Sequence, residues 1–283
     1  MQRRTFFKLG AGAAIAGGPF AGFVNSPAGA SALATQPTVG LVPVADERDG
    51  VVRLHLPEGF KYRSFHDTEQ PVTLDDGTRL PGRHDGMGAF GNADGSVTLV
   101  RNHEVNGSPG SFGPPSAPVY DSAAGGGTTS VRVDLEGHVD DAITSLSGTM
   151  MNCSGGIMPW GSWITCEETV NGPDVGPDYT NTPNTGLKKP HGYVFEVPVA
   201  GRATAEPITS AGRFCHEAVS WDGKYLYLTE DNFGFASGFY RYKPPNEPEV
   251  DGYLADGGKL EMLRVVGEDN AHLEGSFERG TTF

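Results

Sequence analysis

This chain of 283 residues contains few cysteines and few basic residues. Three cysteines cannot all pair within one chain, so at least one thiol is free or serves another purpose. Lys and Arg number 21 against 35 Asp and Glu, giving a formal net charge of −14. Nucleic acid and anionic lipid require a basic surface, so this balance argues against both as partners. An acidic chain suits cations instead.

Long apolar runs are also missing. The stretch from Leu9 to Val24 is interrupted by glycines and Pro19, which makes it a poor membrane span. It follows a twin-arginine pattern, Arg3-Arg4-Thr5-Phe6-Phe7-Lys8, and precedes small residues at 28–32 that suit cleavage. The sequence therefore predicts a signal peptide over residues 1–32 with no stable membrane anchor. We expect the twin-arginine export machinery to deliver the protein to the periplasm or the medium.

Helical periodicity is scarce, whereas Gly and Pro number 41 and 21. This composition favours short strands joined by many turns, and residues 33–283 are enough for one all-β domain. Tight hairpin turns are expected at 92–95 and 221–224. Further strands are expected at 128–135, 192–197 and 237–242, and no long helix is expected outside the signal peptide.

Three strand-forming runs end in acidic clusters, at residues 98–104, 162–168 and 225–231. Glu104, Glu167 and Glu230 are spaced by 63 residues each time. A repeat that brings a carboxylate to the same end of successive strands suggests a ring of strands around a shared polar site. The sequence therefore predicts a β-propeller, an architecture built from repeats of four-stranded units. Roughly four such units fit in the residues present.

A second polar cluster lies upstream of each acidic strand end: His84-Asp85, Asn152-Cys153 and Cys215-His216-Glu217. Carboxylates suit calcium, magnesium or manganese, whereas a thiolate or imidazole indicates a softer or redox-capable ion such as iron or zinc. Converging like charges repel, and bound cations relieve that cost. The predicted ligands are Cys153, Glu104, Glu167, Glu168, Glu217, Glu230 and Asp231.

The cysteines and the isolated histidines allow other interpretations. We interpret Cys153 as a metal-binding thiolate, and a Cys153–Cys166 disulfide across a hairpin is the alternative. Cys166 and Cys215 are otherwise expected to be small buried residues. The histidines outside the motifs are expected to be ordinary surface or packing residues; they are His55, His66, His138 and His191.

Several of these motifs together resemble the PhoX family of alkaline phosphatases. They are Asn102-His103-Glu104, the block from Gly148 through Asn152-Cys153-Ser154-Gly155-Gly156 to Cys166-Glu167-Glu168, His216-Glu217-Ala218, Leu228-Thr229-Glu230-Asp231, and Ser237-Gly238-Phe239-Tyr240-Arg241. The resemblance implies a six-bladed propeller that holds Fe³⁺ and Ca²⁺ and hydrolyses phosphate monoesters outside the cytoplasm. It implies that Cys153 binds iron and that Glu217, Glu167, Glu168, Glu230 and Asp231 bind iron or calcium.

The mechanism that the resemblance implies is metal-ion catalysis with a metal-activated oxygen nucleophile. Cys153, Glu217 and Glu167 are then the expected catalytic residues, and small phosphate esters the expected substrates. A serine nucleophile at Ser154 is disfavoured because no Gly-x-Ser-x-Gly elbow surrounds it. Two alternatives remain: a calcium-dependent lactonase or organophosphate hydrolase propeller, and a non-catalytic propeller fragment stabilised by calcium.

The end of the chain departs from the family pattern. At 63 residues per unit the next acidic strand end would fall near position 293, whereas the chain stops at Phe283. The sequence is therefore interpreted as truncated at its C-terminus, with an incomplete metal site.

Overall fold

The computed structural model describes residues 40–67, 70–177, 181, 183–200, 202–234 and 236–267. The chain divides into two compact units, Met1–Ser64 and Phe65–Phe283. In the described part of the first unit, β1 (Leu41–Ala45) and β2 (Val52–Pro57) form an antiparallel hairpin. The twin-arginine pattern lies outside the described residues. Within those residues we find no helix with the length and apolar character needed to cross a membrane.

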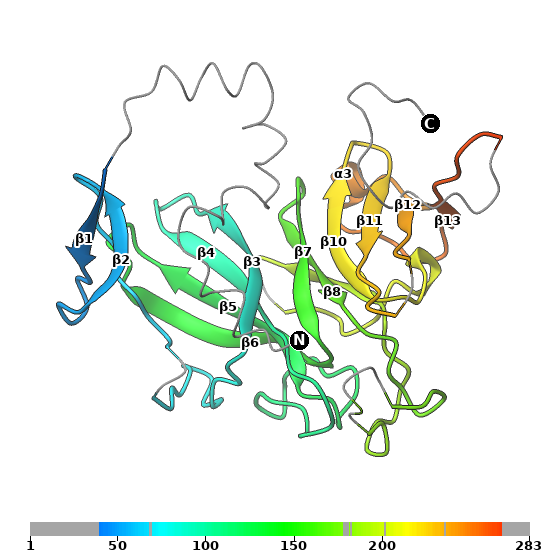
Figure 1. Cartoon of the computed structure of the whole chain (residues 1–283), viewed down its shortest axis with the longest axis horizontal. Helices are drawn as coiled ribbons and strands as arrows, with labels where there is room; N and C mark the ends of the chain where they lie inside the picture. The colour runs from blue at the N-terminus through cyan, green and yellow to red at the C-terminus, as the bar shows by residue number, and fades with distance from the viewer. Residues whose placement is uncertain are drawn as a thin grey trace. The chain divides into compact units, whose positions relative to one another are not determined.

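The second unit contains three antiparallel sheets that follow one another along the chain (Figure 1). Blade 1 consists of β3 (His84–Gly91), β4 (Val97–His103), β5 (Gly126–Val133) and β6 (Val139–Thr149). Blade 2 consists of β7 (Asn152–Met158), β8 (Ser162–Glu167) and β9 (Val194–Pro198). Blade 3 consists of β10 (His216–Trp221), β11 (Leu226–Glu230), β12 (Phe239–Lys243) and β13 (Lys259–Met262).

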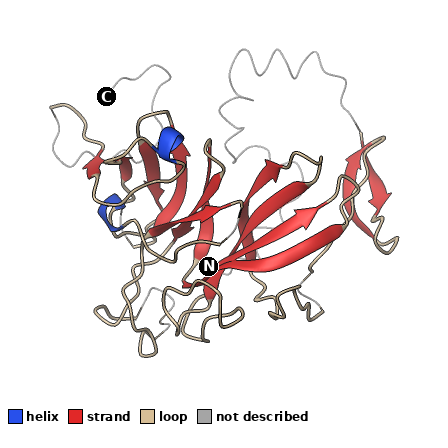
Figure 2. Cartoon of the chain, turned by 180° about the vertical axis from the view of Figure 1, so that it is seen from behind, coloured by secondary structure: helices blue, strands red, loops and turns tan. Residues whose placement is uncertain are grey.

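Strands account for nearly all of the regular structure (Figure 2). The helical elements named in the described residues are short: η2 (Thr209–Ala211) and α3 (Pro248–Asp251). Within each blade, every strand pairs with its neighbour in sequence, and the first strand of blade 2, β7, contacts the first strands of blades 1 and 3. Up-and-down sheets that meet along their first strands are the blades of a β-propeller. The predicted all-β propeller class is therefore confirmed.

Both predicted hairpin turns are present. The turn between β3 and β4 is closed by the Asn92 N–H to the Ser96 carbonyl at 2.8 Å, and Gly95 adopts the positive φ of 88° that such a turn requires. In the turn between β10 and β11, the Asp222 carboxylate accepts the amides of Lys224 and Tyr225 at 2.8 Å each. These short connections fix the strand registers on which the position of every inner-strand side chain depends.

Strand β6 was not predicted at its full length of 11 residues. Its C-terminal half carries hydroxyls where a core strand normally carries apolar side chains, yet Thr144, Ser145, Ser147 and Thr149 are fully buried. These hydroxyls have partners outside β6, for example Ser145 with Thr128 of β5 at 2.7 Å. Because buried hydroxyls are tolerated when they are paired, sheet contacts override the polar sequence pattern here.

Apolar residues fill the space between adjacent blades. Between blades 1 and 2, Val100 and Leu146 belong to the same buried cluster as Trp163 and Phe195. Between blades 2 and 3 the cluster consists of Met158, Ile164, Cys166, Val194, Ile208, Ala211, Phe214, Val219, Leu226, Leu228, Tyr242 and Leu254. Face-to-face burial of this kind is the dominant stabilising term, and it holds the first strands together.

Glycines allow β7 to lie tightly between its neighbours. A Cβ at Gly155 would lie 1.9 Å from the Ile164 carbonyl oxygen of β8, and one at Gly156 would lie 2.3 Å from the Val219 carbonyl oxygen of β10. Both distances are shorter than a van der Waals contact, so these positions exclude a side chain.

We expect Gly155→Ala to lower the free energy of unfolding by roughly 1–3 kcal/mol, because its methyl group would force β7 away from β8. The matched control is Gly91→Ala at the end of β3, where no atom lies within 4 Å of the added Cβ. Urea unfolding of both variants tests this. Equal effects of the two substitutions would contradict the close approach.

Candidate metal centre

All three blades begin with the same irregularity. The first residue of each first strand pairs with a residue at the end of the second strand: His84 with His103, Asn152 with Glu167, and His216 with Glu230. The register then shifts, which marks a β-bulge. Asp85, Cys153 and Glu217 directly follow these first residues. They therefore occupy equivalent positions in the three bulges.

Next to each of these residue pairs, on the side away from the bulge, a backbone hydrogen bond is also repeated in the three blades. The amides of Glu104, Glu168 and Asp231 donate to the carbonyls of the residues preceding each first strand, Arg83, Met151 and Cys215, at 2.8, 3.0 and 3.0 Å. Register thus makes Glu104 equivalent to Glu168 and Asp231. The 63-residue spacing had aligned Glu104 with Glu167 and Glu230, which is wrong by one residue, because the step between blades 1 and 2 is one residue longer than the step that follows.

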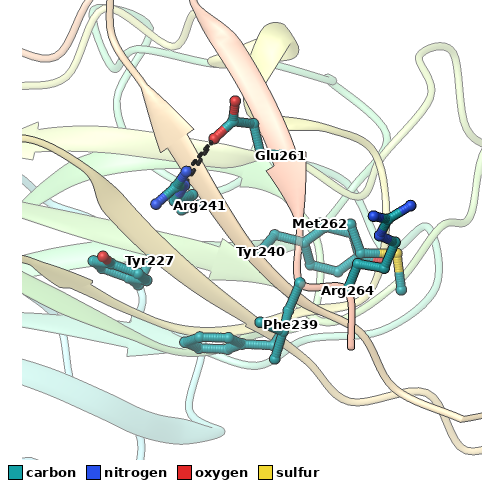
Figure 3. A pocket seen from close by; sticks show the side chains of 8 residues that line it. Tyr227, Phe239, Tyr240, Arg241, Glu261, Met262 and Arg264 are labelled. Atoms are coloured by element: carbon teal, nitrogen blue, oxygen red, sulfur yellow. Dashed lines mark hydrogen bonds and ion pairs between the residues drawn. The ribbon is translucent and has the colours of Figure 1, made fainter. Parts of the chain in front are cut away.

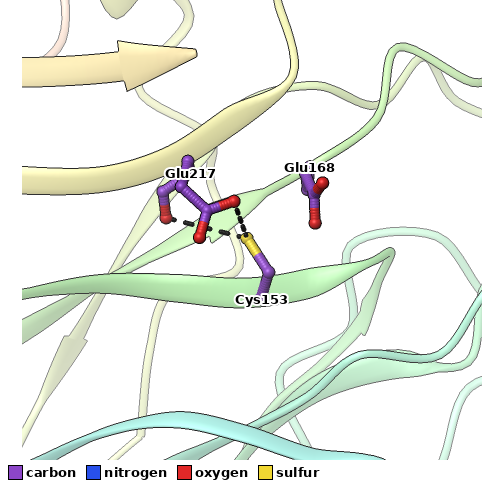
Figure 4. Close-up of side chains that lie close together, drawn as sticks. All are labelled: Cys153, Glu168 and Glu217. Atoms are coloured by element: carbon purple, nitrogen blue, oxygen red, sulfur yellow. Dashed lines mark hydrogen bonds between the residues drawn. The ribbon is translucent and has the colours of Figure 1, made fainter. Parts of the chain in front are cut away.

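Two of the blades bring three predicted ligands together (Figure 4). One ligand atom each from Cys153, Glu168 and Glu217 lie within 4.8 Å of one another. The Cys153 Sγ lies 3.5 Å from Glu217 Oε2 and 3.5 Å from the His216 carbonyl oxygen. Cys153 and Glu168 are buried, whereas Glu217 is half-buried. The strand starts of β7 and β10 and the residue after β8 therefore form a compact acidic cluster around one thiol.

The cluster holds its acidic groups in an unfavourable environment. Burial, followed by the charges of Glu217, Asp231 and Glu104, raises the pKa of Glu168 to about 7. Burial also raises the pKa of Glu217, as do the neighbouring Asp231 and Asp85 carboxylates. For the Cys153 thiol, burial raises the pKa well above its usual range. A bound cation would reverse each of these shifts.

Three further carboxylates surround the cluster. Asp85 and Glu104 come from blade 1 and Asp231 from blade 3, and each of them raises the pKa of Glu217. Glu104 is partly neutralised by Arg83, whose Nη2 lies 2.6 Å from Glu104 Oε2. Each blade therefore contributes one residue from its bulge and one carboxylate from the end of its second strand.

Two predicted ligands have their oxygens engaged elsewhere. The fully buried Glu167 carboxylate accepts the amides of Met150, Gly192 and Tyr193 at 2.9, 2.8 and 3.0 Å, and the His191 ring at 2.6 Å. The Glu230 carboxylate accepts the Gly238 amide at 2.8 Å and the Tyr240 hydroxyl at 3.0 Å. His103, at the equivalent position of blade 1, binds the Gly82 carbonyl. In each of these blades, the residue that pairs with the first residue of the first strand thus forms hydrogen bonds that stabilise the protein.

His191 is more than the ordinary packing residue expected from the sequence. It is fully buried, with Nδ1 2.6 Å from Glu167 and Nε2 3.5 Å from Asp121. Burial lowers the pKa of His191, but the Glu167 and Asp121 carboxylates outweigh burial and raise it. This pairing attaches the loop before β9 to the end of β8.

The three thiols are free, so the alternative Cys153–Cys166 disulfide is not formed. Cys166 is fully buried in the apolar cluster between blades 2 and 3, as expected of a small core residue. Cys215 is half-buried and does not belong to the acidic cluster.

A hollow of about 510 Å³ on blade 3 has a different character (Figure 3). It is lined by Tyr227, Phe239, Tyr240, Arg241, Glu261, Met262, Leu263 and Arg264. Its carboxylate, Glu261, already pairs with Arg241 at 2.7 Å. None of the predicted ligands lines this hollow, so the acidic cluster is the better candidate for the functional site.

Sequence reasoning left Asp85 out of the ligand set. It noted the His84-Asp85 pair, but the acidic ends were aligned by counting along the chain. Equivalence with Cys153 and Glu217 follows only from the bulges. The signal that could have found Asp85 is the pattern of a polar residue followed by Asp, Cys or Glu at the start of every unit.

Comparison with known proteins gives the family of this chain. The family model "Alkaline phosphatase PhoX" matches residues 39–143 and 124–279. Among solved structures, the chain is similar to Pseudomonas fluorescens PhoX in complex with vanadate, a transition state analogue, at 16% identity and a TM-score of 0.49. That match covers 79% of this chain and 55% of the solved chain, so the present chain spans about half the length of that protein. No curated protein matches. The family match extends over most of the sequence, and the chain therefore belongs to the PhoX alkaline phosphatase family.

Proposed function

We propose that this chain carries the metal centre of an exported phosphatase that hydrolyses phosphate monoesters with iron and calcium. The observation that carries the proposal is the convergence of a buried thiol with the carboxylates of Glu168 and Glu217 within 4.8 Å. Membership of an alkaline phosphatase family supports the reaction class. The twin-arginine pattern at residues 3–8 supports export.

The residues present fit the proposed ions. A thiolate among carboxylates suits iron better than calcium, and the outer carboxylates, which lack a thiol, suit calcium. The raised pKa values of Cys153, Glu168 and Glu217 fit a site whose ligands ionise when a cation binds. We propose Cys153, Glu168 and Glu217 as iron ligands, and Glu104, Asp231 and Asp85 as calcium ligands.

When bound, the ions would supply Lewis acidity that neutralises phosphate oxygens and lowers the pKa of water. The chain's own part is to hold the ligands in place. Asn102 contributes by joining blade 1 to blade 2: its Nδ2 donates to the Ser154 carbonyl at 2.8 Å, and its Oδ1 accepts from Trp163 Nε1 at 3.0 Å. Because Ser154 directly follows Cys153, these hydrogen bonds hold the backbone next to the thiol.

The thiol also separates this proposal from the alternatives. A calcium-dependent lactonase or organophosphate hydrolase has no reason to place a cysteine among its carboxylates, and a calcium-stabilised fragment without activity has none either. The position of Cys153 at the centre of the cluster therefore favours the mixed-metal phosphatase.

We expect Cys153→Ser to lose bound iron and phosphatase activity, because a serine hydroxyl does not replace a thiolate as an iron ligand. The measurement is elemental analysis of protein purified without added metal, together with hydrolysis of a chromogenic phosphate monoester. The control is Cys215→Ser, which removes a thiol outside the cluster. Iron retained in Cys153→Ser, or lost equally from both variants, would refute the assignment.

The neighbouring glutamates are expected to respond differently to the same change. Glu168→Gln removes a proposed ligand and should abolish metal binding. After chelator treatment the free energy of unfolding of this variant should not fall, because the substitution removes one of several crowded negative charges. Glu167→Gln breaks a buried pair with His191 and should lower the free energy of unfolding by about 3 kcal/mol or more. Chemical denaturation of both variants after chelation checks this. If Glu168→Gln lost more stability than Glu167→Gln, the roles assigned to the two glutamates would be wrong.

A further inference from the structure

A half-exposed arginine lies beside Glu104, at the edge of the acidic cluster. Arg83 directly precedes β3, and its guanidinium makes two hydrogen bonds to Glu104, from Nη2 to Oε2 at 2.6 Å and from Nε to the main-chain carbonyl at 3.1 Å. The Glu104 amide donates in return to the Arg83 carbonyl at 2.8 Å. The guanidinium is therefore held in one orientation, although 58% of the Arg83 side chain is exposed.

The other two blades show that the backbone does not require an arginine at this position. The residues that accept the equivalent amide hydrogen bonds in blades 2 and 3 are Met151 and Cys215. Met151 has the same left-handed backbone conformation as Arg83, with φ values of 49° and 48° respectively, and its neutral side chain is buried. The shared geometry of the strand starts is thus compatible with a neutral side chain.

Neutralising a carboxylate does not account for Arg83 either. Glu104 corresponds to Glu168 and Asp231 by register. Among the ion pairs of the described residues, Glu104 pairs with Arg83, whereas neither Glu168 nor Asp231 pairs with a lysine or an arginine. Blades 2 and 3 therefore hold the equivalent carboxylate without a positive neighbour, and blade 1 adds a charge that the other two do without.

The guanidinium of Arg83 keeps hydrogen-bond donors for a ligand. Arginine has five N–H groups, and the two bonds to Glu104 use the one on Nε and one of the two on Nη2. Among the described residues, none accepts a hydrogen bond from Nη1. Because the side chain is more than half exposed, a ligand from solvent can reach the guanidinium without a rearrangement of the chain.

Arg83 lies farther out than the place where the reacting phosphate is proposed to bind. That phosphate would bind at the ions held by Cys153, Glu168 and Glu217. Glu104 is among the charges that act most strongly on the pKa of Glu168 and of Glu217, whereas Arg83 is not. Glu104 therefore lies between the cluster and the guanidinium, which is placed to meet the far end of a bound ester.

We propose that Arg83 binds a second anionic group of the substrate, a carboxylate or a further phosphate on the alcohol part of the ester. The preferred substrates are then phosphate monoesters whose leaving group carries a negative charge. Guanidinium groups bind carboxylates and phosphates through planar, directional hydrogen bonds. In a chain with a net charge of −14 a second anionic group is otherwise unfavourable, so a fixed arginine at the site discriminates between substrates. This inference rests on the proposed phosphatase function.

The test measures the binding of two phosphonates that cannot be hydrolysed, phenylphosphonate and 4-carboxyphenylphosphonate, to the full chain purified with its metals. Titration calorimetry of the wild-type protein should show about fivefold tighter binding of the carboxylated compound, as expected of one well-oriented exposed ion pair. In Arg83→Met the two affinities should become equal. Methionine suits this backbone conformation, because Met151 adopts it in blade 2.

Two further variants identify the cause of the preference. Arg83→Lys keeps the charge but loses the planar guanidinium, so it should retain part of the preference. Arg132→Met removes an exposed arginine of blade 1 that pairs with Asp94, and it should keep the full preference. Iron and calcium are measured in each variant, since loss of either ion from Arg83→Met would assign the arginine to the metal centre and overturn the inference.

The outcomes separate this inference from the proposed function. Equal affinities of the wild-type protein for the two phosphonates, or a preference that persists in Arg83→Met, would overturn the inference and leave the proposed function untouched. Hydrolysis of phenyl phosphate tests the proposed function separately. If the wild-type protein does not hydrolyse that ester, the phosphatase function is refuted and this inference with it.

Discussion

The candidate centre depends on one backbone hydrogen bond that is repeated in each blade. It runs from the residue after the second strand to the residue before the first strand, at 2.8 to 3.0 Å. Because it closes the pair that precedes each bulge, it fixes the position of the bulge residue and of the carboxylate beside it. Three such closures place the acidic groups of separate blades at one locus, although the blades share almost no other sequence. The apolar packing between blades then holds these strand starts together.

At these strand ends, neighbouring acidic residues have different roles. Successive side chains of an extended chain point in opposite directions, so Glu167 and Glu168 meet different surroundings. Glu167 is satisfied by three amides and His191, which makes it part of the scaffold. Glu168 meets Glu217 and Cys153, and its pKa is raised to about 7. The same division recurs in blade 3, where Glu230 binds its own blade and Asp231 faces the cluster. Because the hydrogen bonds of Glu167 and Glu230 stabilise the strand ends, the protein can hold the charges of the acidic cluster close together.

The sequence predicted much of this, and its errors have physical causes. The fold class and both hairpin turns follow from turn residues and from the repeat. Of the seven predicted ligands, the structure brings three together, namely Cys153, Glu168 and Glu217. Strand β6 was missed because its buried hydroxyls imitate a solvent-exposed segment. The one-residue misalignment of Glu104 arose because the chain between the strand ends of blades 1 and 2 is one residue longer than the chain between those of blades 2 and 3. The scaffold role of Glu167 depends on His191, 24 residues later, and the pairing of Arg101 with His66 spans 35 residues. Such distant contacts cannot be found by counting along the chain.

The central claim is that a thiolate from blade 2 and carboxylates from two blades bind one iron ion. X-ray absorption at the iron edge of the purified protein tests it most directly, because sulfur scatters more strongly than oxygen in the first coordination shell. We predict a sulfur neighbour to iron that disappears in Cys153→Ser. Iron surrounded by light atoms alone in the wild-type protein would contradict the assignment of Cys153 and, with it, the proposed arrangement of the centre.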